Sequence, residues 1–157
     1  MEPMEESSDG PGCFIIIGAV ISLLLGLGVL FLVSGCQGTP VITLPTGVGW
    51  LQMRSADGTY QIALNLPENP PLNQELLVEG VVLRSGQVLS EEAQIRFDGG
   101  MPQHGHGLAV PVETHRRSGS GFVAEGVRFH MRGRWLITLD VQEGPHLERA
   151  RAWVVIR

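Results

Sequence analysis

From residue 58 onward, hydrophobic residues recur at every second position in short runs. Tyr60, Ile62 and Leu64 alternate with Gln61, Ala63 and Asn65. An alternation of this period places the hydrophobic side chains on one face of a β-strand. Residues 74–84 also predict a strand, but both of its faces carry Leu or Val, so its register stays open. The other alternating sets are Ile95 and Phe97; Leu108, Val110 and Val112; Val127, Phe129 and Met131; Trp135, Ile137, Leu139 and Val141; and Ala150, Ala152, Val154 and Ile156.

Turn-forming residues separate these runs, and no helical period appears after residue 36. The turns are expected at Ser85-Gly86, at residues 98–100, at Ser118-Gly119, at Gly133 and at Gly144-Pro145. About seven short strands with turns between them are typical of an immunoglobulin-like β-sandwich of roughly 100 residues. We therefore predict that residues 58–157 form such an all-β domain. Its core should contain Ile62, Leu64, Ile95, Phe97, Val110, Phe129, Trp135, Ile137, Leu139 and Val154.

The N-terminal region has a different composition. Residues 1–12 carry Glu and Asp without a basic residue and predict an acidic disordered tail. Phe14–Val33 has no charged residue and is long enough for a helix that crosses a bilayer, which takes about 20 apolar residues. We predict one transmembrane helix or signal anchor over residues 13–35, followed by a Pro- and Gly-rich linker over residues 36–57.

Cys36 offers a second way to anchor the chain. The sequence Val33-Ser-Gly-Cys36 resembles a bacterial lipobox, in which the cysteine is lipidated after cleavage before it. However, the N-terminal flank is acidic, whereas that of a signal peptide is positively charged, and the apolar run exceeds the usual length of about 7–15 residues. An uncleaved span is therefore the favoured prediction and lipidation at Cys36 the alternative. The charges near the span do not specify its orientation.

Charge and cysteine content exclude several classes of function. The chain of 157 residues has a net charge of −5 and no lysine, which argues against general nucleic-acid binding. Cys13 and Cys36 both precede the strand region, so that region holds no disulfide and no thiolate metal ligand. No motif frames a serine nucleophile, no glycine-rich phosphate loop follows a strand, and Glu91 and Glu92 fit a solvated loop. We predict that the protein is not an enzyme.

The densest group of potential metal donors is the stretch Met101-Pro-Gln-His-Gly-His-Gly107. On an extended chain, the spacing of two residues puts the rings of His104 and His106 on one side. Imidazole suits copper and zinc, and the thioether of Met101 favours Cu(I). Copper is therefore the cofactor that this stretch predicts. The alternative is a structural turn, in which Gly105 and Gly107 permit positive φ angles and the histidines bind no metal.

The remaining histidines are weaker candidates. Met131 shares the parity of Phe129 and should face the core, where methionine more often fills gaps than binds metal. His130 faces the other way between two arginines, which disfavour a cation. His130 and Met131 are therefore kept as less favoured ligands. His115 and His146 are expected in exposed loops.

These features in this order resemble the YtkA-like family of bacterial exported domains, which is related to the FixH-like proteins of cytochrome oxidase assembly. The match comprises Met101-Pro-x-His-x-His-Gly107, then Pro111, then Gly126-Val-x-Phe-x-Met-x-Gly133-x-Trp135, within residues 58–157. The resemblance implies an immunoglobulin-like sandwich outside the cytoplasm, held at the bacterial cell membrane by an N-terminal span or lipid. It also carries Met101, His104 and His106 over as candidate copper ligands, and the second motif as framework. The chain lacks the methionine-rich tail of copper chaperones.

The sequence features and the family resemblance together predict two alternative functions. The first is a single-pass, membrane-anchored extracytoplasmic accessory protein that binds copper through the Met/His loop, for copper handling in the cell envelope or for oxidase assembly. The second is an interaction module without metal, docking on a membrane partner such as a respiratory complex. Convergence of His104, His106 and a sulfur atom would favour the first, and inward packing of either imidazole would favour the second.

Overall fold

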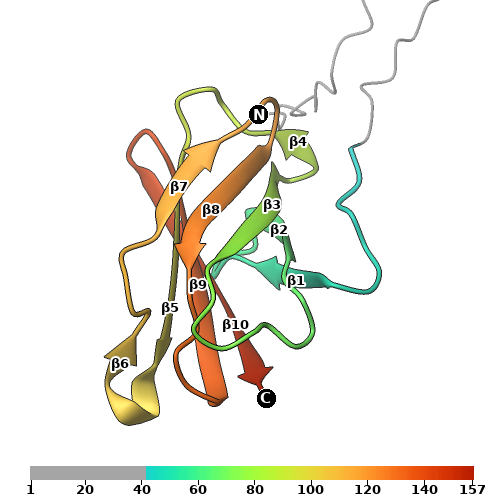
Figure 1. The fold of residues 1–157 in the computed structure, drawn as a ribbon. Coiled ribbons are helices and arrows are strands. Elements are labelled where there is room, and N and C mark those ends of the chain that lie inside the picture. The colour runs from blue at the N-terminus through green and yellow to red at the C-terminus, as the bar shows by residue number, and fades with distance from the viewer. Residues whose placement is uncertain (1–41) are drawn as a thin grey trace, which may run out of the picture. The chain divides into compact units, whose positions relative to one another are not determined.

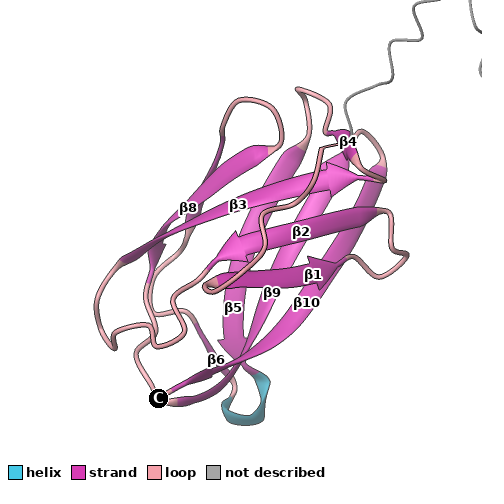
Figure 2. Ribbon diagram, turned by 90° about the vertical axis from the view of Figure 1, so that its right-hand side faces the viewer, coloured by secondary structure: helices cyan, strands magenta, loops and turns pink. Residues whose placement is uncertain are grey.

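The computed structural model describes residues 42–157, which form two antiparallel β-sheets with one short 3₁₀ helix. The first sheet has the order β1-β2-β3-β8-β7, with β4 paired to β3, and the second has the order β10-β9-β5-β6. The sheets lie in separate layers (Figures 1 and 2). The elements are β1 (Trp50–Arg54), β2 (Tyr60–Asn65), β3 (Leu76–Arg84), β4 (Gln87–Val88), β5 (Gln94–Met101), η1 (Pro102–His104), β6 (His106–Gly107), β7 (Glu113–Arg116), β8 (Gly121–Val127), β9 (Gly133–Glu143) and β10 (His146–Ile156).

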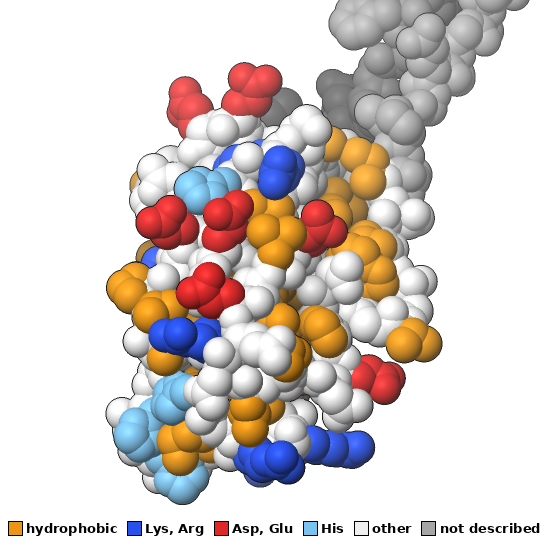
Figure 3. Space-filling view, in the orientation of Figure 1, with side chains coloured by type: hydrophobic (Ala, Val, Ile, Leu, Met, Phe, Trp, Pro, Cys, Tyr) orange, Lys and Arg blue, Asp and Glu red, His pale blue; other side chains and the backbone are white. Residues whose placement is uncertain are grey.

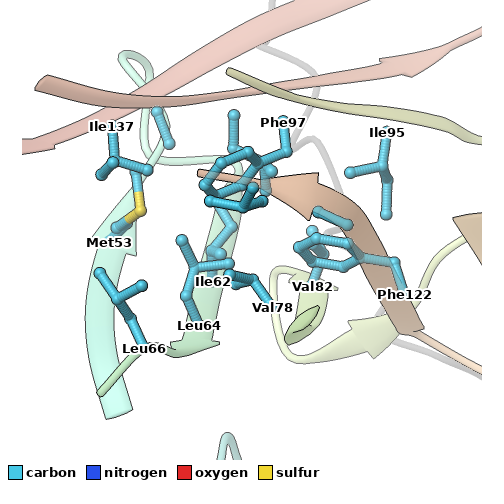
Figure 4. Packing of buried hydrophobic residues seen from close by; sticks show 14 of the residues in the cluster. Met53, Ile62, Leu64, Leu66, Val78, Val82, Ile95, Phe97, Phe122 and Ile137 are labelled. Atoms are coloured by element: carbon cyan, nitrogen blue, oxygen red, sulfur yellow. The ribbon is translucent and has the colours of Figure 1, made fainter. Parts of the chain in front are cut away.

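The hydrophobic core lies between the two sheets. Ile95, Phe97 and Ile137 extend from the second sheet toward Ile62 and Val82 of the first (Figure 4). This arrangement confirms the all-β prediction and the alternation in β2, β5 and β9, where the hydrophobic positions are buried. The predicted core residues that are buried are Ile62, Leu64, Ile95, Phe97, Phe129, Trp135, Ile137 and Leu139, while Val154 is partly buried against this cluster.

The structure also assigns the register of β3. Val78, Gly80 and Val82 face the core, and Leu83 is also buried, on the opposite face of the strand. Gly80 has no side chain because the ring of Phe122 on β8 occupies the space that a Cβ atom would need. Both faces of β3 are therefore partly covered, which explains why its sequence shows no clean alternation.

Two predicted strands differ from the structure. Residues 108–112 form a connection rather than a strand, and Val110 lies outside the core cluster. Pro111 lacks the backbone N–H that a sheet ladder needs, and regular pairing begins only at Glu113. Strand β8 ends at Val127, so alternation does not continue to Met131, whose side chain is exposed rather than buried.

The region of strands begins earlier than residue 58. Strand β1 lies within the stretch predicted as linker and pairs with β2 along its whole length. Leu51 and Met53 alternate with Gln52 and Arg54, so the period-two pattern that marks the later strands is also present here. The predicted acidic tail, the apolar segment Phe14–Val33 and Cys36 lie outside the described residues. Within residues 42–157, no helix is long and hydrophobic enough to cross a membrane.

Polar contacts connect the two sheets at the ends of β9 and β10. Tyr60 of β2 donates a hydrogen bond of 2.9 Å from its hydroxyl to Glu143 of β9. His146 is half-buried at the start of β10 rather than in an exposed loop, and its Nε2 lies 2.6 Å from the buried carboxylate of Glu148. His115 is exposed but also belongs to a strand, β7.

Candidate histidine site

A tight hairpin at the end of β5 presents the two histidines that the sequence singled out. Met101, the last residue of β5, pairs with His106 of β6, and Gly100 pairs with Gly107. Pro102 opens the intervening 3₁₀ helix, a position where its missing N–H costs nothing. Gly105 closes the helix with a φ angle of 67°, in the left-handed region that glycine adopts readily.

His104 and His106 are both exposed on this hairpin. Their ring centroids are 6.4 Å apart, with an angle of 33° between the ring planes. Within residues 42–157, neither ring forms a hydrogen bond with the protein. Figure 3 shows the histidine side chains that gather on the surface at the end of the domain that carries β6. Both imidazoles are thus available to a ligand from solvent.

His130 is the third member of this group, although its sequence neighbours made it a less favoured candidate. It lies in the connection from β8 to β9, which brings it 6.0 Å from His106 between ring centroids. Its ring also lies edge-on to Trp135, with 5.4 Å between centroids. The Nδ1 atom of His130 is buried and has no hydrogen-bond partner among the described residues.

Two hydrogen bonds hold the connection that carries His130, and a third ties the neighbouring hairpin to β9. The indole N–H of Trp135 donates to the carbonyl of Met131 over 3.0 Å. The backbone N–H of Asn73 donates to the carbonyl of Phe129 over 2.8 Å. The side-chain amide of Gln103 donates to the carbonyl of Arg134 over 2.8 Å and so ties the His104 turn to β9. The backbone beside His130 is therefore held at Phe129 and Met131, and the turn before His104 is held at Gln103.

The burial of the two candidate sulfur ligands, Met101 and Met131, is the reverse of the prediction. Met101 is only 1% exposed and belongs to the core, where its methyl group packs closely against Gly133. Met131 is 36% exposed and follows His130 directly in the chain. Of these two thioethers, the more accessible one therefore belongs to Met131. The sequence could not indicate this, because it does not show where β8 ends.

The group has the right chemistry for a soft or borderline metal ion, but its rings are not closed around one. Two imidazoles on one tetrahedral metal would have centroids about 5 Å apart, given metal–nitrogen bonds of about 2.0–2.1 Å. The observed separations of 6.0 and 6.4 Å are somewhat larger. In residues 42–157, no three His, Cys, Asp or Glu side chains are already grouped so as to hold a metal ion. Rotation of exposed side chains would be needed to close the site.

The charged residues near the site help to decide which metal ions it could bind. Arg128 and Arg132 each lie two residues from His130 in the sequence, one on either side, so positive charge is close to His130 along the chain. The nearest acidic residue in the hairpin sequence, Asp98, bonds the backbone N–H of Gly99 and lies 3.9 Å from Arg96. The predicted solvated residues Glu91 and Glu92 are indeed exposed. The site is thus built from nitrogen donors, which suit copper or zinc better than Mg²⁺ or Ca²⁺.

Comparison with known proteins adds no relative. No family model, curated protein or solved structure matches this chain.

Proposed function

We propose that this protein is a membrane-anchored, extracytoplasmic accessory protein that binds copper at a site formed by His104, His106 and His130. The observation that supports this proposal is the convergence of three imidazoles from two separate connections, with the buried Nδ1 of His130 left unpartnered. A buried polar atom without a partner costs free energy, and such an atom in a native structure calls for an explanation. A bound metal ion that orders the three rings would provide one.

Copper is preferred over other metals because of the donor set. Imidazole ligands suit copper, and divalent copper binds nitrogen sites more tightly than the other divalent ions of the first row. With Met101 in the core, Met131 is the better placed thioether, and its participation would increase the affinity for Cu(I). We therefore propose Cu(II) as the ion held by the three histidines and Met131 as an adjustable fourth ligand.

The order of strands supports an immunoglobulin-like sandwich. If β1 is set aside, the first sheet has the order β2-β3-β8-β7 and the second has β10-β9-β5-β6. These orders correspond to strands A-B-E-D and G-F-C of an immunoglobulin constant domain, with β6 added beside strand C. The YtkA-like resemblance implies the same fold outside the cytoplasm. On this proposal, the span Phe14–Val33 anchors the domain at a bacterial membrane for copper handling or oxidase assembly.

Copper binding is tested with the full-length protein purified in detergent. Wild-type protein should retain stoichiometric copper after desalting, as measured by elemental analysis. The double change His104→Ala, His106→Ala should abolish retention, and His130→Ala should weaken it by roughly 10- to 100-fold. His115→Ala is the matched control, because His115 is exposed and lies in β7. Acidification should release the metal, because protons compete for the neutral imidazole that binds it.

The methionines separate the possible ligand sets. Met131→Leu should lower Cu(I) affinity more than Cu(II) affinity, since only the soft sulfur is lost. Met101→Leu should leave both affinities nearly unchanged if Met101 serves the core, as its burial indicates. Stoichiometric copper that survives the double histidine change would refute this site. Absence of copper from the wild-type protein, with the histidine variants unfolding more readily, would favour the interaction module instead.

A further inference from the structure

Three of the five methionines lie within residues 42–157, and their side chains differ in exposure. Met53 and Met101 are 5% and 1% exposed and belong to the core cluster, whereas Met131 is 36% exposed and lies outside that cluster. Oxidation of a sulfur-containing side chain depends on whether the oxidant can reach the sulfur atom. Among the methionines of the described residues, Met131 is therefore the one that an oxidant in solution reaches most readily.

Met101 is protected by close packing. A Cβ atom added at Gly133 would lie 2.8 Å from the methyl carbon of Met101, so the ends of β5 and β9 leave little space around this side chain. An oxidant reaches such a sulfur only when the core opens, and core strands open far less often than exposed segments. Met101 and Met131 thus share the same intrinsic chemistry within one chain and differ in accessibility.

The backbone at Met131 is held in place although its side chain is exposed. The indole N–H of Trp135 donates to the carbonyl of Met131 over 3.0 Å, and the N–H of Asn73 donates to the carbonyl of Phe129 over 2.8 Å. Neither bond uses the side chain of Met131, and this side chain does not belong to the core cluster. Addition of an oxygen atom to its sulfur should therefore leave the fold intact, whereas a sulfoxide at Met101 would place a polar group in the core.

The position of Met131 connects its oxidation to the candidate histidine site. Met131 directly follows His130, whose ring centroid lies 6.0 Å from that of His106. Thioether sulfur favours Cu(I), whereas imidazole nitrogen also suits Cu(II). A sulfoxide is a polar group that no longer offers the soft thioether sulfur. Oxidation of Met131 should thus lower the affinity of the site for Cu(I) and leave its affinity for Cu(II) nearly unchanged.

We propose that Met131 is a reversible oxidation site, at which peroxides weaken the binding of Cu(I). In the forward reaction, the O–O bond of hydrogen peroxide breaks, one oxygen atom bonds to the sulfur, which loses two electrons, and the other leaves as water. In the reverse reaction, a methionine sulfoxide reductase takes two electrons and two protons from a dithiol, the sulfoxide oxygen leaves as water, and the dithiol becomes a disulfide. The oxidation does not require copper, but its effect on Cu(I) rests on the proposed function.

The first measurement uses metal-free, full-length protein in detergent, with hydrogen peroxide as the oxidant. Cleavage after arginine by trypsin places Met131 in residues 129–132 and Met101 in residues 97–116, so mass spectrometry follows the added oxygen at each residue separately. Met131 should gain oxygen at least about tenfold faster than Met101, because reaction at Met101 requires opening of the core. In concentrated urea the two rates should become similar, which would show that the fold causes the difference.

The second measurement compares the copper affinities of oxidised and untreated protein. After removal of peroxide, the oxidised protein should bind Cu(I) roughly tenfold more weakly and Cu(II) equally well. Treatment with a methionine sulfoxide reductase and a dithiol should restore the affinity for Cu(I). Met131→Leu is the matched control, because it keeps a hydrophobic side chain without the sulfur. Peroxide should leave the Cu(I) affinity of this variant unchanged.

The two measurements separate this proposal from the copper function on which part of it rests. Equal oxidation rates of Met131 and Met101 in the folded protein would overturn the proposal. Selective oxidation of Met131 with unchanged Cu(I) affinity, in a protein that binds copper, would overturn it as well. Absence of copper from the untreated protein would refute the proposed copper function and the effect on Cu(I), while the oxidation rates would still decide whether Met131 is the modified residue.

Discussion

Trp135 connects the core to the candidate histidine site, so its replacement tests both. Its side chain is fully buried, its ring lies edge-on to Phe129 at 5.2 Å between centroids, and His130 packs against it at 5.4 Å. Replacement of a buried Phe or Trp by Ala usually costs about 3–5 kcal/mol. Loss of the hydrogen bond to the Met131 carbonyl adds about 1 kcal/mol. We expect Trp135→Ala to lower the free energy of unfolding by about 4–6 kcal/mol.

That loss is a large part of the roughly 5–15 kcal/mol that stabilises a typical domain. Trp135→Phe is the matched variant, because it keeps an aromatic ring in the core while it removes the N–H donor to Met131 and part of the buried ring volume. It should cost about 1–2 kcal/mol and should loosen the backbone that carries His130. Urea unfolding of the full-length protein, followed by far-ultraviolet circular dichroism, gives both values.

Copper retention by the same two variants completes the test. Trp135→Phe should remain folded and yet hold copper less tightly than wild type, because its Met131 carbonyl has lost its anchor. A Trp135→Ala protein as stable as wild type would refute the assignment of Trp135 to the core. A Trp135→Phe protein with reduced stability and unchanged copper affinity would show that His130 is positioned by other contacts.

Three further predictions concern other parts of the molecule. Burial alone would raise the pKa of Glu148, but contacts with Ser55, Thr59 and His146 lower it to about 2. The ionised Glu148 therefore stabilises the fold fully above the ordinary pKa of 4.5, and this stabilisation is lost as the pH falls toward 2. Glu148→Gln should lower the free energy of unfolding by about 3 kcal/mol at neutral pH. It should also make the stability of the protein less dependent on pH in the acidic range, as measured by unfolding at several pH values. Gly133→Ala should lower the free energy of unfolding by about 1–3 kcal/mol, measured by thermal unfolding. The φ angle of Gly133 is 128°, and a Cβ atom there would lie 2.8 Å from the methyl carbon of Met101. Unchanged stability of this variant would contradict that packing. Finally, the chain should stay in membranes after carbonate washing if residues 14–33 span the bilayer, and a diacylated Cys36 at the N-terminus in mass spectrometry would identify the lipoprotein route instead.

The sequence predicted the strands whose two faces meet different environments. In β9, Trp135, Ile137 and Leu139 face the core while their neighbours face outward, so the alternation gave the register directly. The register of β3 does not follow from its sequence in this way, because Leu83 and Val82 are both buried although their side chains point to opposite faces of the strand. Strand β1 lies in a stretch that predicts a linker, because the glycines and prolines before it dominate the composition of that stretch.

The candidate site was predictable only in part. The spacing of His104 and His106 predicts two rings on one side of an extended chain, whereas the structure places them around a 3₁₀ turn that ends at the left-handed Gly105, with ring centroids 6.4 Å apart. The approach of His130 depends on where β8 ends and how the chain crosses to β9, which are tertiary properties. The burial of Met101 likewise follows from its contact with Gly133, a residue far away in sequence.

The short hairpin that carries His104 and His106 has a consequence for amide hydrogen exchange. Strand β6 contains two residues and pairs with β5 at only two positions, whereas β9 pairs with neighbours on both sides. Segments with few protected backbone groups open locally at much lower free energy than the central strands of a sheet. The amides of residues 103–107 should therefore exchange far faster than those of β9. The two rings on this hairpin can thus adjust their separation by local opening, while the sheets beneath them stay closed.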